Sequence, residues 1–307
     1  MIEYNKIFRQ AYSLTKTHKF LWLFGLFLFW GNVLNLAYTL QGNQGSSSND
    51  FYSNSVVRWL QTHPQASFWI LLGFAILLTT FVYLYFRSKI ASIIAIKALV
   101  EKQETSLSQS LQVSRWFFSR VIGLSIVLNL VWFALTVVVA TPILYLFSTG
   151  QIGRGSILAL LGATIILPTS LVILFLNILG PMFIVCFDLT IGEAVRNSFD
   201  LIAKYWPRLT LFGVSLLVGV LISVIVSVII ALVPFVLLAV LAYHKMTALS
   251  NFFLQTITIG LGIIVFLALQ SVVVIFQQTS WVLVFLDLVK PEKLEDEAAV
   301  GAAEVIS

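Results

Sequence analysis

Residues 190–231 read TIGEAVRNSFDLIAKYWPRLTLFGVSLLVGVLISVIVSVIIA, and this stretch decides the fold class. Its first 19 residues mix charged, polar and apolar side chains, whereas the 23 residues that follow carry no charge. Thr190 and Glu193 have the spacing of a capping box, in which two side chains satisfy amide groups at a helix start. We predict a helix lying on a membrane surface that leads directly into a membrane-spanning helix.

Residues 190–208 have two faces when they are drawn as a helix. Apolar side chains recur at three- and four-residue spacing, which is typical of a helix with one apolar face. The predicted apolar face consists of Ile191, Ala194, Val195, Phe199, Ile202 and Trp206. Residues 1–19 and 106–120 show the same pattern, and Ser106 with Gln109 forms a second capping box. We call 1–19, 106–120 and 190–208 the amphipathic segments.

Each amphipathic segment precedes an apolar run, so the chain contains three similar units, each made of an amphipathic segment and the apolar run that follows it. Superposing Gly25 on Gly213 aligns THKFLWLFG with YWPRLTLFG, and it aligns Lys16 with Lys204. The middle copy aligns WFFSRVIG on Gly123. Such a pattern predicts a fold built from similar helix-plus-span units. The alternative is that any basic, aromatic segment next to a membrane looks like this, and the sequence leaves both explanations open.

The composition excludes an ordinary water-soluble domain. The chain has 307 residues, of which 59% are hydrophobic and only 10% are charged. Its mean hydropathy is +0.99. A soluble domain has about 25% charged residues because its surface must be hydrated. Lipid is therefore the solvent for most of these side chains. The single cysteine, Cys186, excludes an intramolecular disulfide framework and is most simply a packing residue.

Apolar runs divide residues 1–290 into about six membrane spans, so the predicted fold is an all-α integral membrane helical bundle with cytoplasmic-face amphipathic helices. The spans cover residues 20–40, 67–86, 121–147, 157–187, 209–232 and 252–288. The second span is expected to continue as a helix past the headgroups. Residues 41–66 form a Gly-, Ser- and Asn-rich outer loop, and the acidic tail 291–307 is predicted to be disordered.

Prolines predict interruptions in three places. Pro168 and Pro181 lie inside the fourth span, and Pro234 lies near the end of the fifth. Proline removes a backbone donor and tends to kink a membrane helix. We expect a break at Pro234, and residues 233–243 are either a re-entrant piece or an interfacial one.

The basic residues give the orientation. With six spans, 15 of the 18 Lys and Arg residues fall on the side of the two termini, and only Arg58, Arg154 and Lys245 fall on the other side. Because positive loops remain in the cytoplasm, both termini are predicted to be cytoplasmic, in the cell membrane. Topology explains the formal net charge of +5, so we expect membrane lipids, anionic lipids among them, and no nucleic acid as partners.

Three segments resemble a known family. FRQAYSLTKTHKFLWLFGLFLFWG (8–31), LTIGEAVRNSFDLIAKYWPRLTLFGVSLL (189–217) and SWVLVFLDL (280–288) resemble uncharacterised bacterial polytopic membrane proteins. These are related to the membrane domain that precedes some glycerophosphoryl diester phosphodiesterases. The resemblance implies a multi-pass membrane protein of unassigned function. We expect no phosphodiesterase domain here, because the sequence has no cluster of His and acidic residues for its metal site.

The sequence carries no recognisable reaction chemistry. It contains no GxSxG, HExxH or GxxxxGK[ST] motif. His63, His244 and Asp50 are too few for a metal site. The spans have no ionisable residue away from their ends, which argues against an ion-coupled transporter. We therefore predict a protein that is not an enzyme and uses no cofactor or metal.

Polar amides in the spans either line a polar path or hydrogen-bond between helices, and they are Asn129, Asn177, Gln270, Gln277 and Gln278.

Two sets of residues are candidates for function and packing. The candidate lipid-headgroup contacts are Lys16, Lys19, Arg115, Arg120, Arg196, Lys204 and Arg208. The candidate helix-packing face of the fifth span consists of Ser215, Gly219, Ser223 and Ser227. We expect a structural, lipid-associated or accessory role. The alternative is a transporter or permease for an apolar or amphipathic solute, which the proline-containing spans favour.

Overall fold

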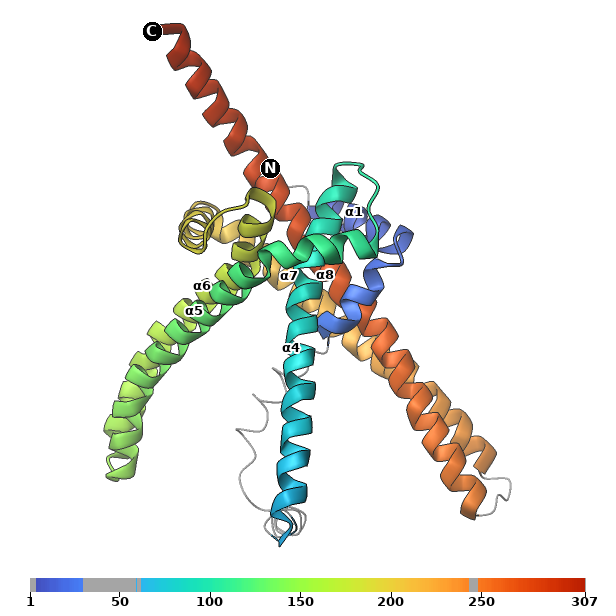
Figure 1. Cartoon of the computed structure of the whole chain (residues 1–307). Coiled ribbons are helices and arrows are strands. Elements are labelled where there is room, and N and C mark those ends of the chain that lie inside the picture. The colour runs from blue at the N-terminus through green and yellow to red at the C-terminus, as the bar shows by residue number, and fades with distance from the viewer. Residues whose placement is uncertain (1–3, 30–58, 60–61, 243–247, 307) are drawn as a thin grey trace. The chain divides into compact units, whose positions relative to one another are not determined.

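The computed structural model describes residues 4–29, 59, 62–242 and 248–306, and these residues form helices and no strand. Figure 1 labels α1 (Tyr4–Thr17), α4 (Pro64–Val100), α5 (Leu107–Ser148), α6 (Ile152–Phe187), α7 (Ile191–Ala242) and α8 (Ala248–Ile306). The five helices α4 to α8 are long and apolar enough to cross a membrane. The predicted all-α membrane class is confirmed.

The predicted spans lie inside longer helices. Residues 67–86 belong to α4, which continues without interruption to Val100, as expected. In α5 the second amphipathic segment and the third span form one continuous helix that begins at the predicted capping box. The Gln109 amide donates to Ser106 Oγ at 3.3 Å, and the Ser106 amide donates to Gln109 Oε1 at 3.1 Å. Of the first predicted span, only residues 20–29 are described, and residues 21–29 are helical.

The one break inside a long helix is not at the predicted prolines. Among the described residues, α6 passes through Pro168 and Pro181, and α7 passes through Pro234 to Ala242. Membrane helices tolerate such prolines because local adjustments satisfy the freed backbone groups. The non-helical residue inside α7 is Tyr205, with φ −118° and ψ 19°. Pro207 explains this position, because it has no amide hydrogen to donate to the carbonyl one turn earlier.

The acidic tail also differs from its prediction. Disorder was expected for residues 291–307, whereas α8 extends to Ile306. Alanine and glutamate, which dominate this stretch, are among the residues with the highest helix propensity. High helix propensity therefore favours continuation of α8 through this acidic stretch.

The chain divides into two compact units. Unit 1 contains residues 1–18, 90–222 and 276–307, and unit 2 contains residues 19–89 and 223–275. The predicted single membrane domain, residues 1–290, thus contains parts of both.

Aromatic side chains form the core of unit 1. Tyr4 and Phe8 of α1 stack on Phe212 of α7, with ring centroids 5.9 and 5.4 Å apart. Phe212 also meets Trp281 of α8 edge-on at 5.1 Å, and Trp281 meets Phe175 of α6 at 6.0 Å. Edge-on and stacked aromatic pairs add to the stabilisation from burial. This cluster therefore connects α1, α6, α7 and α8 within the unit.

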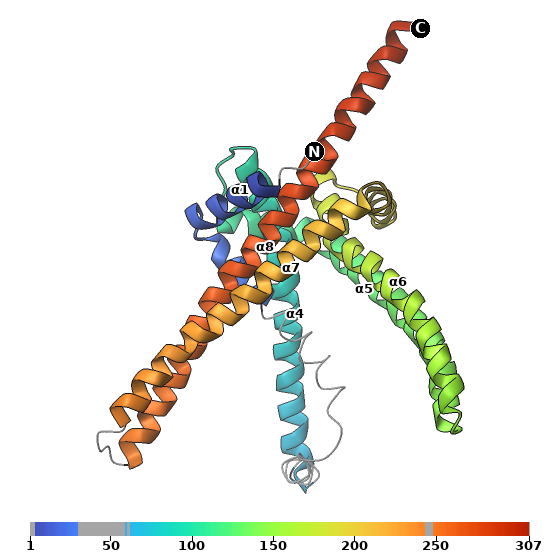
Figure 2. The same ribbon diagram turned by 180° about the vertical axis from the view of Figure 1, so that it is seen from behind.

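Small residues of α6 set the packing of α5 on α6, which run side by side in both views (Figure 1, Figure 2). A Cβ added to Gly162 would lie 2.7 Å from Val139, and one added to Gly180 would lie 2.6 Å from Leu124. Between these contacts, Trp132 Nε1 donates to Ser170 Oγ at 3.0 Å. Close backbone approach at small residues is a common way for membrane helices to pack.

Gly25 has the same role in unit 2. A Cβ at Gly25 would collide with the backbone carbonyl of Ser271 in α8. Phe29 meets Phe266 of α8 edge-on, with ring centroids 5.9 Å apart. The helix formed by residues 21–29 therefore packs directly on α8.

The environments of Gly25 and Gly213 support the predicted repeat. In unit 2, Leu21, Phe24 and Leu28 are 0%, 1% and 4% exposed, and in unit 1 their counterparts Leu209, Phe212 and Leu216 have the same three values. The helix breaks also correspond, because α1 ends at Thr17 and its counterpart is Tyr205. The two copies thus bury the same pattern of side chains after a break at the same position.

The middle copy requires a correction. In α5 the buried apolar residues Val121, Leu124 and Leu128 have the spacing of Leu21, Phe24 and Leu28. The small residue among them is Ser125, so the alignment on Gly123 is two residues out of register. Alignment by residue type places Gly123 opposite Gly25, whereas alignment by buried side chains places Ser125 opposite Gly25.

Candidate functional site

The amphipathic segments each bury one side against unit 1. In α1 the buried residues are Ile7, Ala11 and Thr15. In α5 small hydroxyl residues, Ser110 and Ser114, lie in the buried face. The first turns of α7 bury Ala194, Ser198, Leu201 and Ile202.

Within the predicted apolar face of residues 190–208, Phe199 is directed away from the core of unit 1. This side chain is 52% exposed, and its neighbour Ser198 is fully buried. The helix turns by about 100° per residue, so a packed face that passes through Ser198 directs Phe199 away from the core. The capping box holds this turn in place: the Thr190 amide donates to Glu193 Oε2 at 2.9 Å, and the Glu193 amide lies 3.5 Å from Thr190 Oγ1.

Each amphipathic segment exposes an aromatic ring near an exposed cation. Tyr12 is 61% exposed, and Lys16 lies 5.9 Å from the centre of its ring. Trp116 is 79% exposed and follows the exposed Arg115 in sequence. Phe199 lies one turn after the exposed Arg196. Three of the seven candidate headgroup residues therefore occupy the same kind of surface.

Lys204 and Arg208 are brought together at the break in α7. The Lys204 ammonium lies 5.4 Å from the centre of the Tyr205 ring, and the Arg208 guanidinium lies 5.7 Å from it. Both cationic side chains are exposed. Lys19 is also exposed, in the turn between α1 and residues 21–29 of unit 2. The break gathers two of the predicted cations around one aromatic ring.

Arg120 has a different environment from the other candidates. Its Nη1 lies 2.8 Å from Asp188 Oδ1 and donates to the carbonyl groups of Asp188 and Leu189. Lys97 Nζ donates to the carbonyl of Cys186 at 3.0 Å. Two cations from α4 and α5 thus satisfy the carboxyl end of α6, where unpaired carbonyls attract positive charge. The sequence analysis did not identify Lys97 or Asp188, although a carboxylate directly after an apolar span was a usable signal.

The predicted packing face of the fifth span belongs partly to unit 1 and partly to unit 2. In unit 1, Ser215 and Gly219 are exposed, and a Cβ at Gly219 would meet no atom within 4 Å. In unit 2, Ser223 is half-buried and Ser227 is buried. Helices approach each other closely at Gly25, Gly162 and Gly180, as described above.

Two of the span amides donate hydrogen bonds within their own helices. Asn129 donates to the carbonyl of Ser125, one turn earlier in its own helix, and Asn177 does the same to Ile173. The Nε2 atoms of Gln270 and Gln278 are buried with no hydrogen-bond partner among the described residues. Gln277 is half-buried.

The histidine candidates give no metal site. His63 stacks on Trp59 and its Nδ1 lies 2.9 Å from Thr62 Oγ1, so local contacts occupy it. His244 and Asp50 lie outside the described residues. In the described part of the chain, no three His, Cys, Asp or Glu residues lie close enough to hold a metal ion.

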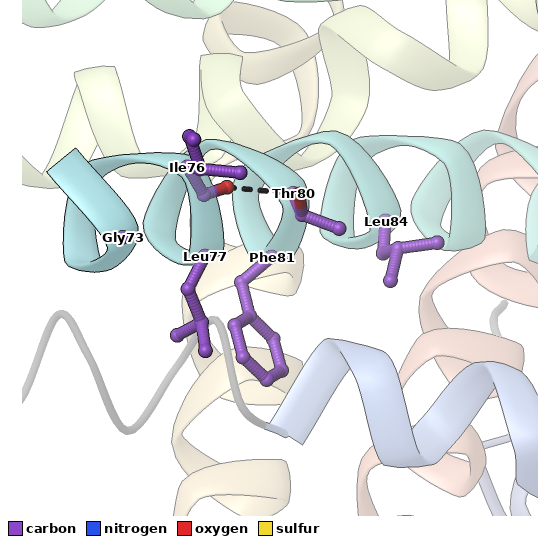
Figure 3. A pocket seen from close by; sticks show the side chains of 6 residues that line it. All are labelled: Gly73, Ile76, Leu77, Thr80, Phe81 and Leu84. Atoms are coloured by element: carbon purple, nitrogen blue, oxygen red, sulfur yellow. Dashed lines mark hydrogen bonds between the residues drawn. The ribbon is translucent and has the colours of Figure 1, made fainter. Parts of the chain in front are cut away.

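An apolar hollow lies along α4 in unit 2 (Figure 3). It is lined by Gly73, Ile76, Leu77, Thr80, Phe81 and Leu84. The Thr80 hydroxyl donates to the carbonyl of Ile76 at 2.8 Å, so the polar group of this lining is already satisfied. The described lining is therefore mainly apolar, which suits contact with an acyl chain.

No family model, curated protein or solved structure matches this chain. The resemblance to the membrane domain of glycerophosphoryl diester phosphodiesterases is therefore untested and stays a prediction.

Proposed function

We propose that this protein is a non-enzymatic, lipid-associated protein of the cell membrane, with both termini in the cytoplasm and anionic lipids as partners. The observation that carries the proposal is that each of the three amphipathic segments exposes an aromatic ring and a cation within four residues of each other.

The chemistry of the membrane interface supports this assignment. Tyrosine and tryptophan are favoured at headgroup level, where one part of the ring meets apolar chains and another meets water. Anionic headgroups attract lysine and arginine, and each basic residue near such a surface contributes about 1 kcal/mol. Tyr12 with Lys16 and Trp116 with Arg115 have both properties, and each pair belongs to a helix whose other side is buried in unit 1.

The test is lipid selectivity of the full-length protein. The protein is purified in detergent, exposed to equal amounts of phosphatidylglycerol and phosphatidylcholine, and examined by native mass spectrometry. We expect retained lipids to be enriched in phosphatidylglycerol, and the enrichment should decrease at high salt because exposed charges are screened. Equal retention of the two lipids would refute an anionic-lipid role.

A further inference from the structure

The amino-terminal turn of α1 forms one wall of an open hollow in unit 1. The hollow has a volume of about 530 Å³ and is lined by Tyr4, Asn5, Lys6 and Arg9. This volume lies within the range of about 300–1,000 Å³ that is typical of small-ligand sites. Lys6 and Arg9 contribute two cations to the described part of this lining.

The hollow adjoins the backbone of α7 near its break. The Tyr4 hydroxyl donates to the backbone carbonyl of Arg208 at 3.4 Å. Arg208 is exposed, and its guanidinium lies 5.7 Å from the centre of the Tyr205 ring. The hollow therefore lies next to the residue at which the charged part of α7 ends.

Tyr4 connects the hollow to the aromatic core of unit 1. Tyr4 itself stacks on Phe212, and Phe8 stacks on Phe212 and on Phe276 of α8. Phe212 lies in the charge-free part of α7, one turn after Arg208. A ligand in the hollow thus contacts cations, and the part of α7 beyond Arg208 that lies next to it is apolar and membrane-spanning.

We propose that the hollow binds the phosphate group of an anionic glycerophospholipid through Lys6 and Arg9. Arginine can donate two parallel hydrogen bonds to phosphate oxygens, and lysine adds a point charge. The amide of Asn5 is available for the polar headgroup beyond the phosphate, and the Tyr4 oxygen, whose proton is donated to the Arg208 carbonyl, can accept a hydrogen bond from it. The proposal rests on the proposed function and assigns its lipid selectivity to one place.

A soluble phosphate ester has the same anionic chemistry, but the position of the site favours a lipid. Arg208 is the last charged residue before the apolar part of α7, which is where phosphate groups of a bilayer lie. Acyl chains attached to the phosphate can then extend along the apolar helices.

The experiment compares two variants of the full-length protein with equal loss of charge. Lys6→Gln/Arg9→Gln removes cations of the hollow, whereas Lys102→Gln/Arg154→Gln removes exposed cations that lie outside the three amphipathic segments. Binding of phosphatidylglycerol is titrated in detergent by native mass spectrometry. We expect the first variant to bind about tenfold more weakly or worse, and the second to stay within about threefold of wild type. Lys6→Arg/Arg9→Lys keeps the charge and should retain binding.

The outcomes separate this site from the general role. If both glutamine variants lose selectivity equally, attraction is diffuse and the hollow is not the site, although the proposed function survives. If wild type shows no preference for phosphatidylglycerol, both proposals fail. Displacement of bound lipid by millimolar glycerol 3-phosphate would overturn the assignment to a lipid, and an unchanged complex supports it. Thermal unfolding of each variant checks that it is folded.

Discussion

Arg120 Nη1 lies 2.8 Å from Asp188 Oδ1, and this ion pair joins the second amphipathic segment to the turn that precedes the third. Asp188 adopts a left-handed backbone conformation, with φ 56° and ψ 34°, at the carboxyl end of α6. Aspartate tolerates this conformation better than most residues that have a Cβ. The same residue therefore ends the helix and holds Arg120 next to the terminal carbonyl groups.

We predict that Arg120→Ala destabilises the protein more than Asp188→Asn. Asparagine also tolerates the left-handed conformation, so that variant loses only the ion pair, worth about 0.2–1 kcal/mol for an exposed pair. Arg120→Ala additionally removes the donor to two carbonyl groups, and we expect a total cost of about 1–2 kcal/mol. Thermal unfolding in detergent measures both, and a double-mutant cycle isolates the pair. Equal costs for the two variants would show that the carbonyl contacts contribute nothing.

Gly25 and Gly219 should respond in opposite ways to alanine. A methyl group at Gly25 collides with the backbone of Ser271, which cannot move without shifting α8. We expect Gly25→Ala to cost about 1–3 kcal/mol, as overpacking does elsewhere. Gly219→Ala meets nothing within 4 Å and favours the helix by about 1 kcal/mol through its propensity. Unfolding temperatures of the two variants provide the comparison, and a Gly25→Ala protein as stable as wild type would contradict the packing described here.

Gly180 and Leu124 should be coupled in the α5–α6 pair. Gly180→Ala places a Cβ 2.6 Å from the Leu124 side chain, which is fully buried. Leu124→Ala alone leaves a cavity and should cost about 2–5 kcal/mol. In the double variant each change relieves the other, because the new methyl group enters the space that leucine vacates. We expect the double variant to be more stable than the sum of the single costs predicts. Simple additivity in unfolding measurements would exclude direct contact.

Orientation can be tested with single cysteines, since Cys186 is the only one in the chain. In a Cys186→Ser background, Gln151→Cys and Arg115→Cys introduce exposed thiols at the two ends of α5. The distribution of basic residues predicts that Gln151→Cys faces outward. A membrane-impermeant maleimide should label it in intact cells and label Arg115→Cys only after permeabilisation. The reverse pattern would place the termini outside.

Local patterns in the sequence were sufficient for the helices and their caps. Charge-free runs located α4 to α8, and the spacing of Ser106 and Gln109 located the start of α5 because a capping box involves only neighbouring residues. The course of α4 past its membrane span to Val100 was also predictable from helical spacing alone.

Contacts between distant residues were not predictable in the same way. Gly25 and Gly219 both look like packing glycines in apolar runs, yet only Gly25 has a neighbour that requires the absence of a side chain. Phe199 fits an apolar stripe by spacing, but the core lies against Ser198. Asp188 and Arg120 are 68 residues apart, so their pairing depends on how α5 and α6 pack. These features follow from tertiary neighbours that one sequence does not specify.

The break at Tyr205 should depend on Pro207 and not on Pro234. Pro207→Ala restores an amide donor, so α7 should continue through residue 205 as a regular helix. A straight helix from Asn197 to Leu217 spans about 30 Å at 1.5 Å per residue, and a break shortens that distance. Spin labels on cysteines at these two exposed positions, in a Cys186→Ser background, measure it. We expect Pro207→Ala to lengthen the distance toward this limit. Pro234→Ala, within a part of α7 that is already helical, should leave it unchanged. A Pro207→Ala protein with the wild-type distance would show that side-chain packing around Tyr205, and not the missing donor, maintains the break.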